Sequence, residues 1–162
     1  LKSVETTVLR IISRFDDNLA KGEAAFLIAI VAVMTGVVFL QVLYRYVFAQ
    51  PLQWSEELAR YLFVWLSIIG AALALQKKGH FGLDLFYKML STRLQRFIKF
   101  PVVLLMGIVI FVILFQGIIL VQKTALQESP AMGISMAWAY ASLPAGGALM
   151  AIHLIALSLK KP

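Results

Sequence analysis

Cysteine is absent from the sequence, and charged side chains are scarce. The 162 residues include no cysteine, 14% charged residues and 61% hydrophobic residues. Without cysteine, the chain cannot form disulfide bonds, thiolate zinc sites or cysteine-ligated iron–sulfur clusters. Charged residues make up about a quarter of a typical soluble domain, so their shortage, beside so many apolar residues, excludes an ordinary soluble protein. We therefore expect the chain to lie in a lipid bilayer.

Sequence signatures of catalysis and metal binding are also missing. The chain has no HExxH pair, no phosphate-binding glycine loop and no nucleophile elbow. Its two histidines could hold a haem only in a shared pocket, but His80 lies in a basic connection and His153 in an apolar segment that only approaches that surface. We therefore expect that the chain is not an enzyme and that it binds no metal or cofactor. Haem ligation by the two histidines stays open as a less favoured alternative.

Four apolar segments are long enough to cross a membrane as helices, which takes about 17 to 25 residues. No repeat, low-complexity segment or linker divides the chain. The sequence therefore predicts an all-α membrane protein with four transmembrane helices in a single domain, residues 1–162. The four spans cover about residues 24–44, 58–75, 101–121 and 134–159.

The distribution of basic residues predicts the orientation in the membrane. Of the 15 lysines and arginines, all but Arg45, Arg60 and Lys123 fall in the N-terminal segment, the 76–100 connection or the C-terminal tail. Basic residues are enriched in cytoplasmic loops, so both termini and the middle connection of this multi-pass protein are expected in the cytoplasm. The membrane surface also explains the net charge of +7 better than nucleic acid does.

Two further segments have the pattern of helices that lie along a membrane surface. Residues 1–20 and 81–97 repeat apolar side chains every three or four positions and carry polar side chains, Asp16 among them, on the other face. We predict an N-terminal amphipathic interfacial helix over 1–20 and a cytoplasmic horizontal helix over about 81–97, between spans two and three. A solvated helical extension is the alternative for residues 1–20.

The outward end of the second span combines charged and aromatic residues. Ser55 is placed to cap the helix, and two glutamates fall in its first turn, where the helix dipole favours negative charge. An arginine follows them at the spacing of a helical ion pair. The interpretation is an anchored helix end at the aromatic belt, with contact to another subunit as the alternative. The residues concerned are Arg45, Tyr46, Trp54, Glu56, Glu57 and Arg60.

Small residues predict close helix packing in the second and fourth spans. In the fourth, Pro144 removes a backbone donor and is expected to kink the helix. A broken helix can mark a transport site, but no acidic residue accompanies this one, so packing is favoured over substrate contact. The predicted packing residues are Ser67, Gly70, Ala71 and Ala74 in the second span, and Trp138, Pro144, Gly146 and Gly147 in the fourth.

The run RYVFAQPLQWSEELARYLFVWLSIIGAALALQKKGHFGLD resembles the small membrane subunit, or DctQ-type subunit, of tripartite ATP-independent periplasmic (TRAP) transporters. The later run ISMAWAYASLPAGGALMAIHLI resembles the last span of that family, so the resemblance covers most of the chain after residue 20. The positions that carry it in the first run are Arg45-Tyr46, Pro51, Trp54-Ser55-Glu56-Glu57, Arg60-Tyr61, Trp65, Gly70-Ala71 and His80.

The resemblance implies a subunit of a sodium-coupled transporter in the bacterial inner membrane that imports organic acids, such as C4-dicarboxylates or sialic acids. It implies two protein partners besides lipid: a large membrane subunit, which holds the substrate and sodium sites, and a periplasmic substrate-binding protein. The small subunit would bind no substrate and would steady the scaffold. On this reading, we expect the small faces of the second and fourth spans to help form the contact with another subunit. Candidates for docking the periplasmic protein are Glu56, Glu57, Lys123 and Glu128.

Two other classes stay open as alternatives. One is a membrane anchor of a respiratory complex, and the other is a stand-alone four-span exporter. An exporter of that kind needs an ionisable group deep in a span, whereas the carboxylates of this sequence lie at span ends or in connections. The sequence thus favours the transporter subunit.

Overall fold

The computed structural model describes residues 2–77 and 92–159. In this part of the chain the regular elements are helices: α1 (Lys2–Tyr46), α2 (Gln53–Gln76), α4 (Thr92–Thr124), α5 (Ala137–Tyr140) and α6 (Ser142–Leu159). Four stretches are long and apolar enough to cross a membrane: Arg10–Tyr46, Gln53–Gln76, Phe100–Thr124 and Ala137–Leu159. The predicted all-α fold with four membrane-length helices is confirmed.

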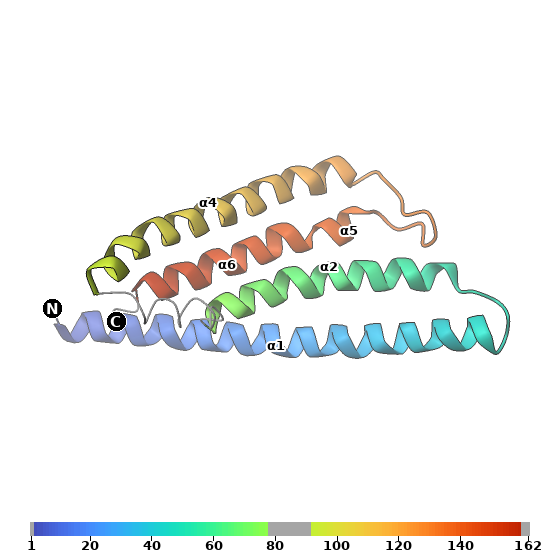
Figure 1. The fold of residues 1–162 in the computed structure, drawn as a ribbon, viewed down its shortest axis with the longest axis horizontal. Helices are drawn as coiled ribbons and strands as arrows, with labels where there is room; N and C mark the ends of the chain where they lie inside the picture. Colours follow the sequence, from blue (N-terminus) through green and yellow to red (C-terminus); the bar gives the residue numbers. More distant parts are fainter. Residues whose placement is uncertain (1, 78–91, 160–162) are drawn as a thin grey trace.

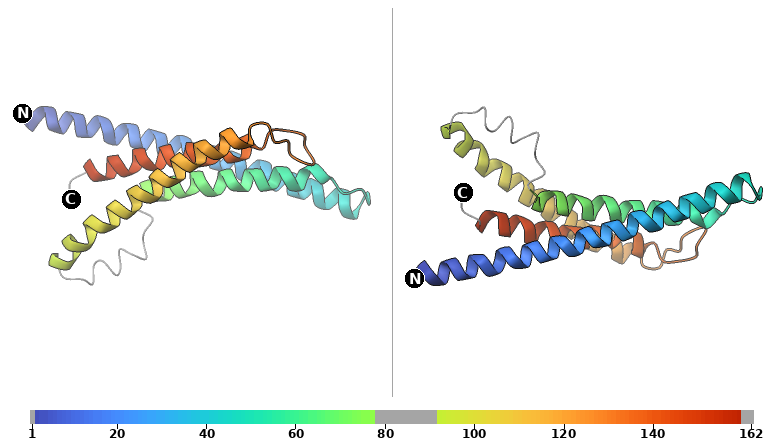
Figure 2. Two further views of the ribbon diagram at one scale, coloured as in Figure 1. Left: turned by 90° about the horizontal axis from the view of Figure 1, so that it is seen from above. Right: turned by 90° about the horizontal axis from the view of Figure 1, so that it is seen from below.

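The helices lie side by side in the order α1, α2, α6, α4 (Figure 1). α2 returns antiparallel along α1, α6 packs on α2, and α4 packs on α6. Figure 2 shows α4 diverging from α1 toward the end of the molecule that holds both termini. We call this the terminal end. The connections 47–52 and 125–136 lie at the opposite end, which we call the loop end, as an even number of spans requires.

One long helix takes the place of the predicted interfacial helix and first span. α1 runs for 45 residues, about 67 Å at a rise of 1.5 Å per residue, more than twice the bilayer core of about 30 Å. The 20–24 stretch between the two predicted elements holds a single glycine, Gly22, and no proline, so nothing there breaks the helix. A separate interfacial helix over residues 1–20 is thus not confirmed.

The predicted horizontal helix over 81–97 falls mostly outside the described residues, which omit 78–91. Its last part, from Thr92, is the beginning of α4, and α4 continues through Pro101 to Thr124. The third span is therefore the second part of a longer helix. A separate horizontal helix is not confirmed.

The fourth span is interrupted close to Pro144, where the sequence predicts a kink. α5 ends at Tyr140, and α6 begins at Ser142 with Pro144 in its first turn. A proline costs little there because the N–H groups of a first turn have no partner within the helix. The Ser142 hydroxyl donates a hydrogen bond of 2.8 Å to the carbonyl oxygen of Ala139 and so links the two pieces.

α6 lies between α2 and α4, and glycines let these neighbours approach it closely. A Cβ atom at Gly146 would overlap the side chain of Ile68 in α2, and one at Gly147 would lie 3.0 Å from the Cβ atom of Leu114 in α4. Many large apolar side chains elsewhere stay exposed, as expected where lipid or a membrane partner surrounds the helices. The buried core beside the glycines consists of Ala72, Leu75, Ile110 and Met150.

Candidate functional site

The carboxylate of Glu57 holds the loop end together. This side chain is buried near the start of α2. Its Oε2 accepts hydrogen bonds from the backbone N–H groups of Ala131 (2.8 Å) and Met132 (3.1 Å), and its Oε1 accepts one from the Tyr61 hydroxyl (2.6 Å). Hydrogen bonds to an ionised acceptor are about twice as strong as neutral ones. Glu57 therefore fastens the 125–136 loop to α2.

The predicted cap of α2 is wrong. The helix begins at Gln53, after an extended Leu52, and no side chain caps it. The Ser55 hydroxyl instead donates to the carbonyl oxygen of Leu52 at 2.7 Å. The reason is a helix boundary that lies three residues earlier than a cap at Ser55 would require, so that Ser55 falls inside the first turn.

The predicted ion pair of Arg60 is not formed within the part of the chain that the structure describes. Arg60 is exposed, and the ion pairs found there do not include it. The two glutamates have other partners: Glu57 binds the loop, and Glu56 accepts a hydrogen bond of 3.0 Å from the Gln41 amide of α1. Arg60 is therefore left on the surface of the loop end.

The small-residue face predicted on α2 is turned away from the other helices of this chain. Ser67, Ala71 and Ala74 are exposed, and a Cβ atom at Gly70 would meet open space. We call these four residues the α2 seam. Contact of this seam with a partner stays a prediction. The buried residues of α2 are Ser55, Glu57, Ile69, Ala72 and Leu75.

The small residues of the fourth span pack within the chain instead. Gly146 and Gly147 are buried between α2 and α4. Pro144 is half-buried, and its Cδ atom would lie 2.9 Å from a Cβ atom at Gly117 of α4. These residues therefore serve the internal packing of α6.

Aromatic and basic residues gather at the loop end. Trp138 is 70% exposed, and its carbonyl oxygen accepts a hydrogen bond of 3.0 Å from the indole N–H of Trp65. The guanidinium of Arg45 lies 5.8 Å from the ring centroid of the exposed Tyr46. Trp54 is also exposed. This distribution agrees with a belt at the membrane–water interface.

Three of the four candidate docking charges are exposed at the loop end. They are Glu56, Lys123 and Glu128, whereas the Glu57 carboxylate faces the loop of its own chain. Glu128 and Ser135 form an antiparallel bridge within that loop. The loop that carries Glu128 is thus held at a fixed place by Glu57.

A buried cluster at the terminal end was not predicted. The His153 ring of α6 lies between two carboxylates of α1: Nδ1 is 2.7 Å from Oδ1 of Asp16, and Nε2 is 2.9 Å from Oε1 of Glu23. The Gln76 amide at the end of α2 donates to Oδ2 of Asp16 at 3.4 Å and to Oδ1 of Asp17 at 3.2 Å. We call Asp16, Glu23 and His153 the histidine cluster.

The sequence held only a weak signal for the histidine cluster. Asp16 and Glu23 are seven residues apart, which places them on one face of α1, and His153 interrupts an apolar segment. The partners of His153 are 137 and 130 positions away, so no local pattern could pair them. The expectation that Asp16 belongs to a polar face at the surface is wrong, because packing against α6 buries it.

The histidine cluster is not arranged as a metal site. Its carboxylates approach opposite nitrogens of one imidazole ring, so the donor atoms do not converge on a point. Over residues 2–77 and 92–159, no group of three or more His, Cys, Asp or Glu side chains could hold a metal ion.

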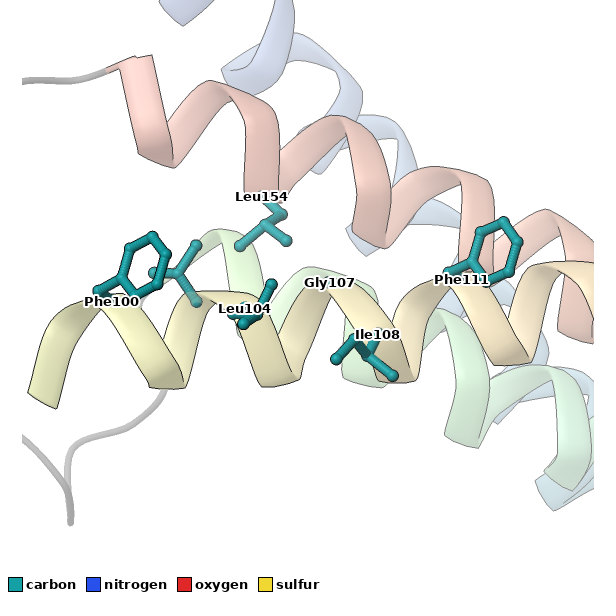
Figure 3. A pocket seen from close by; sticks show the side chains of 7 residues that line it. Phe100, Leu104, Gly107, Ile108, Phe111 and Leu154 are labelled. Atoms are coloured by element: carbon teal, nitrogen blue, oxygen red, sulfur yellow. The ribbon is translucent and has the colours of Figure 1, made fainter.

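An apolar groove of about 470 Å³ lies beside α4 near the terminal end (Figure 3). Leu154 of α6 forms its opposite wall. Because the lining is apolar, the groove supplies no group that could recognise a polar substrate. The lining residues are Phe100, Val103, Leu104, Gly107, Ile108, Phe111 and Leu154.

Comparisons with known proteins agree with the sequence resemblance. Residues 34–161 match the family described as "Tripartite ATP-independent periplasmic transporters, DctQ component". The chain is 31% identical over 130 residues to the sialic acid TRAP transporter small permease protein SiaQ of Vibrio cholerae, a match that covers 79% of this chain and 74% of SiaQ.

Two longer relatives contain a similar segment. The sialic acid TRAP transporter permease protein SiaT of Haemophilus influenzae is 33% identical over 120 residues, 74% of this chain but 20% of SiaT. The isethionate TRAP transporter permease protein DctMQ of Oleidesulfovibrio alaskensis is 28% identical over 144 residues, 84% of this chain but 23% of DctMQ. The chain thus spans a fifth to a quarter of these permeases. Because the family match covers most of its length, the chain belongs to the DctQ component family of the tripartite ATP-independent periplasmic transporters.

Proposed function

We propose that this small permease subunit of a TRAP transporter supports a larger membrane subunit, which imports an organic acid across the bacterial inner membrane on the sodium gradient. The larger subunit holds the substrate and the sodium ions. A periplasmic binding protein delivers the substrate, and both termini of the small subunit lie in the cytoplasm.

One observation carries this proposal: each of the helices α1, α2, α4 and α6 contains a long stretch without Asp, Glu, Lys or Arg. An ion-coupled carrier holds its ion and substrate with polar groups near the middle of the bilayer. Apart from tyrosines, these stretches hold one ionisable side chain, His153, which pairs within the chain with Asp16 and Glu23. This supports the proposal that the coupling site lies in another subunit. The charged residues that bracket the uncharged stretches are Glu23 and Arg45 in α1, Arg60 and Lys77 around α2, and Lys99 and Lys123 in α4.

The lengths of the permeases SiaT and DctMQ support the proposal that this chain has a larger partner subunit. In SiaT and DctMQ, which are named permease proteins, the segment similar to this chain makes up 20% and 23% of the length. In the present chain, the α2 seam and many apolar side chains of α1 and α4 are exposed. A larger membrane subunit would cover part of these surfaces.

The names of the relatives suggest the class of substrate. SiaT and SiaQ are named for sialic acid, DctMQ for isethionate, and a further relative from Vibrio cholerae for C4-dicarboxylate. Each of these is an organic acid. We propose the same class for the transporter to which this chain contributes.

The loop end is the proposed periplasmic side. The basic residues of the sequence are concentrated at the other side of the spans. Exposed Glu56, Lys123 and Glu128 would then face the periplasmic binding protein, and Glu57 would hold the loop in place for it. Charges at the rim of such a contact chiefly steer association.

Reconstitution into lipid vesicles tests the proposal. Sodium-driven uptake of labelled sialic acid and C4-dicarboxylate is compared for the chain alone, the large subunit alone, and both together with the binding protein. We expect uptake only from the complete system. Uptake by the chain alone would contradict the supporting role, and a haem Soret band in the purified chain would favour the respiratory anchor instead.

A further inference from the structure

A second groove, of about 400 Å³, lies at the loop end between the beginning of α2, the 125–136 loop and α5. Its charged lining residues are Glu56, Glu57 and Arg60 of α2, and apolar side chains such as Val64 and Met136 complete its walls. We call it the Arg60 groove. The proposed function uses Glu56 and Glu57 but gives Arg60 no role.

Both carboxylates of the Arg60 groove are engaged within the chain. Glu57 accepts two hydrogen bonds from the backbone of the 125–136 loop and one from the Tyr61 hydroxyl. The Gln41 amide of α1 donates to Oε1 of Glu56 at 3.0 Å and so holds this carboxylate toward α1. Over residues 2–77 and 92–159, neither glutamate forms an ion pair with Arg60.

The groups of the groove that stay free for a ligand are hydrogen-bond donors. The guanidinium of Arg60 is exposed and has no hydrogen bond or ion pair among the described residues. The hydroxyl of Tyr140, which also lines the groove, has no hydrogen-bond partner in the same part of the chain. The planar fork of a guanidinium matches a carboxylate or a phosphate. The Arg60 groove is therefore suited to an anionic group.

The depth of Arg60 makes its charge costly without such a partner. α2 has 24 residues, which span about 36 Å at 1.5 Å per residue. If α2 is centred on a hydrocarbon core of about 30 Å, the Cα atom of Arg60 lies about 7 Å inside the core. Charged side chains at such depths are rare in membrane proteins and are almost always paired. Arg60 therefore calls for an anion within the membrane.

The surroundings of Arg60 favour a protein carboxylate over a lipid phosphate. A phosphate at the membrane surface would lie level with the first turn of α2, where Glu56 and Glu57 repel it. A carboxylate on a neighbouring helix approaches Arg60 from below these acids. The exposed face of α2 continues from Arg60 through Phe63 into the α2 seam at the spacing of one helix face. A single partner helix can therefore cover both.

We infer that the Arg60 groove receives an aspartate or glutamate side chain from a transmembrane helix of the larger subunit, and that this ion pair sets the position of that helix along the α2 seam. The inference rests on the proposed function, which supplies the larger subunit. Small residues let a helix approach closely but do not by themselves fix how far it slides. A charge-assisted pair with two parallel hydrogen bonds does.

Charge changes at Arg60 in the assembled complex test the inference. The chain is co-expressed with its larger subunit, and the share of that subunit that co-purifies in mild detergent is measured. We expect a fall of about tenfold or more for Arg60→Glu and also for Arg60→Gln, which adds no negative charge beside Glu56 and Glu57. Lys21→Glu reverses an exposed charge of α1 at the terminal end and should leave recovery unchanged.

The folding of the variants is checked on the chain alone. Because Arg60 has no partner in the part of the chain that the structure describes, Arg60→Gln should unfold at the same temperature as the wild type in detergent. Lost recovery of the larger subunit without a lower unfolding temperature supports the ion pair. Equal losses of recovery in Arg60→Gln and Lys21→Glu would overturn it.

A charge exchange identifies the partner residue. In the Arg60→Glu background, each Asp and Glu in or beside the spans of the larger subunit is replaced in turn by Lys. We expect one replacement to restore most of the lost recovery, although the same replacement lowers recovery when Arg60 is intact. A loss that no replacement restores would overturn the inference.

Recovery with the wild-type chain separates this inference from the proposed function. If the wild type recovers no larger subunit, the proposed function fails and the inference fails with it. If the wild type, Arg60→Gln and Arg60→Glu recover the larger subunit equally well, only the inference is overturned. Unchanged recovery with loss of bound phosphatidylglycerol, detected by native mass spectrometry, would also overturn it and would assign the groove to a lipid phosphate.

Discussion

The Oε2 atom of Glu57 lies 2.8 Å from the backbone nitrogen of Ala131, 74 residues further along the chain. With a second N–H group from Met132 and the hydroxyl of Tyr61, the carboxylate receives three hydrogen bonds. The Glu57 carboxylate therefore holds the 125–136 loop against α2. Of the two neighbouring glutamates, Glu57 holds the loop in place, whereas the side chain of Glu56 is exposed at the surface of the loop end.

Glu57→Gln should loosen the 125–136 loop. The neutral amide loses the ionised acceptor and places an NH2 group where the loop also offers donors. Hydrogen exchange at the Ala131 and Met132 amides should become several-fold faster. Glu56→Gln is the matched control, because Glu56 is exposed and does not contact these amides; equal exchange in the two variants would contradict the assigned contact.

Gly146→Ala should destabilise the chain. The added Cβ atom would overlap Ile68, and the backbone of α2 lies just beyond that side chain. Overpacking of this kind costs about 1 to 3 kcal/mol in free energy of unfolding, measurable as a lower thermal unfolding midpoint in detergent. Gly70→Ala, at an open helical position, should be neutral or slightly stabilising. Similar losses of stability in both variants would contradict the close approach of α2 and α6 at Gly146.

Gly70→Leu should weaken assembly with the larger subunit without unfolding the chain. A Cβ atom at Gly70 meets open space within the chain, so a leucine would disturb only a partner that packs on the α2 seam. Gly36→Leu, at an equally open position on α1, controls for the effect of bulk alone. Co-purification of the larger subunit should fall for Gly70→Leu; unchanged recovery and uptake would remove the α2 seam from the interface.

Charge reversal at the loop end should reduce uptake in a salt-dependent manner. Glu56→Lys and Glu128→Lys change exposed charges that are proposed to steer the periplasmic protein. The rate of uptake at limiting binding protein should fall most at low ionic strength, and the loss should shrink as salt is added. A loss that is independent of salt, or no loss, would argue against docking at these residues.

Much of the fold could be predicted because its determinants are local in sequence. Apolar runs of sufficient length indicate the four spans, and Pro144 indicates the break before α6. The continuity of α1 was missed because the amphipathic pattern before residue 20 and the apolar run after Ala24 suggested two elements, although no residue between them breaks a helix.

The contacts of the polar residues could not be predicted in the same way. His153 meets Asp16 across 137 positions, and Glu57 meets the loop across 74. Such pairs depend on how α6 and the loop pack on α1 and α2, which periodicity does not reveal. Even the local cap predicted at Ser55 is wrong, because α2 begins three residues earlier than that cap requires and the hydroxyl donates to the Leu52 carbonyl oxygen instead.

Mild-detergent purification of the chain from its native cell, followed by mass spectrometry of the proteins that accompany it, tests the proposed supporting role most directly. The account predicts that a large multispanning membrane protein is recovered in a fixed ratio to this chain, and that a periplasmic binding protein joins when the transported acid is present. Recovery of the chain alone, or with subunits of a respiratory enzyme, would contradict it.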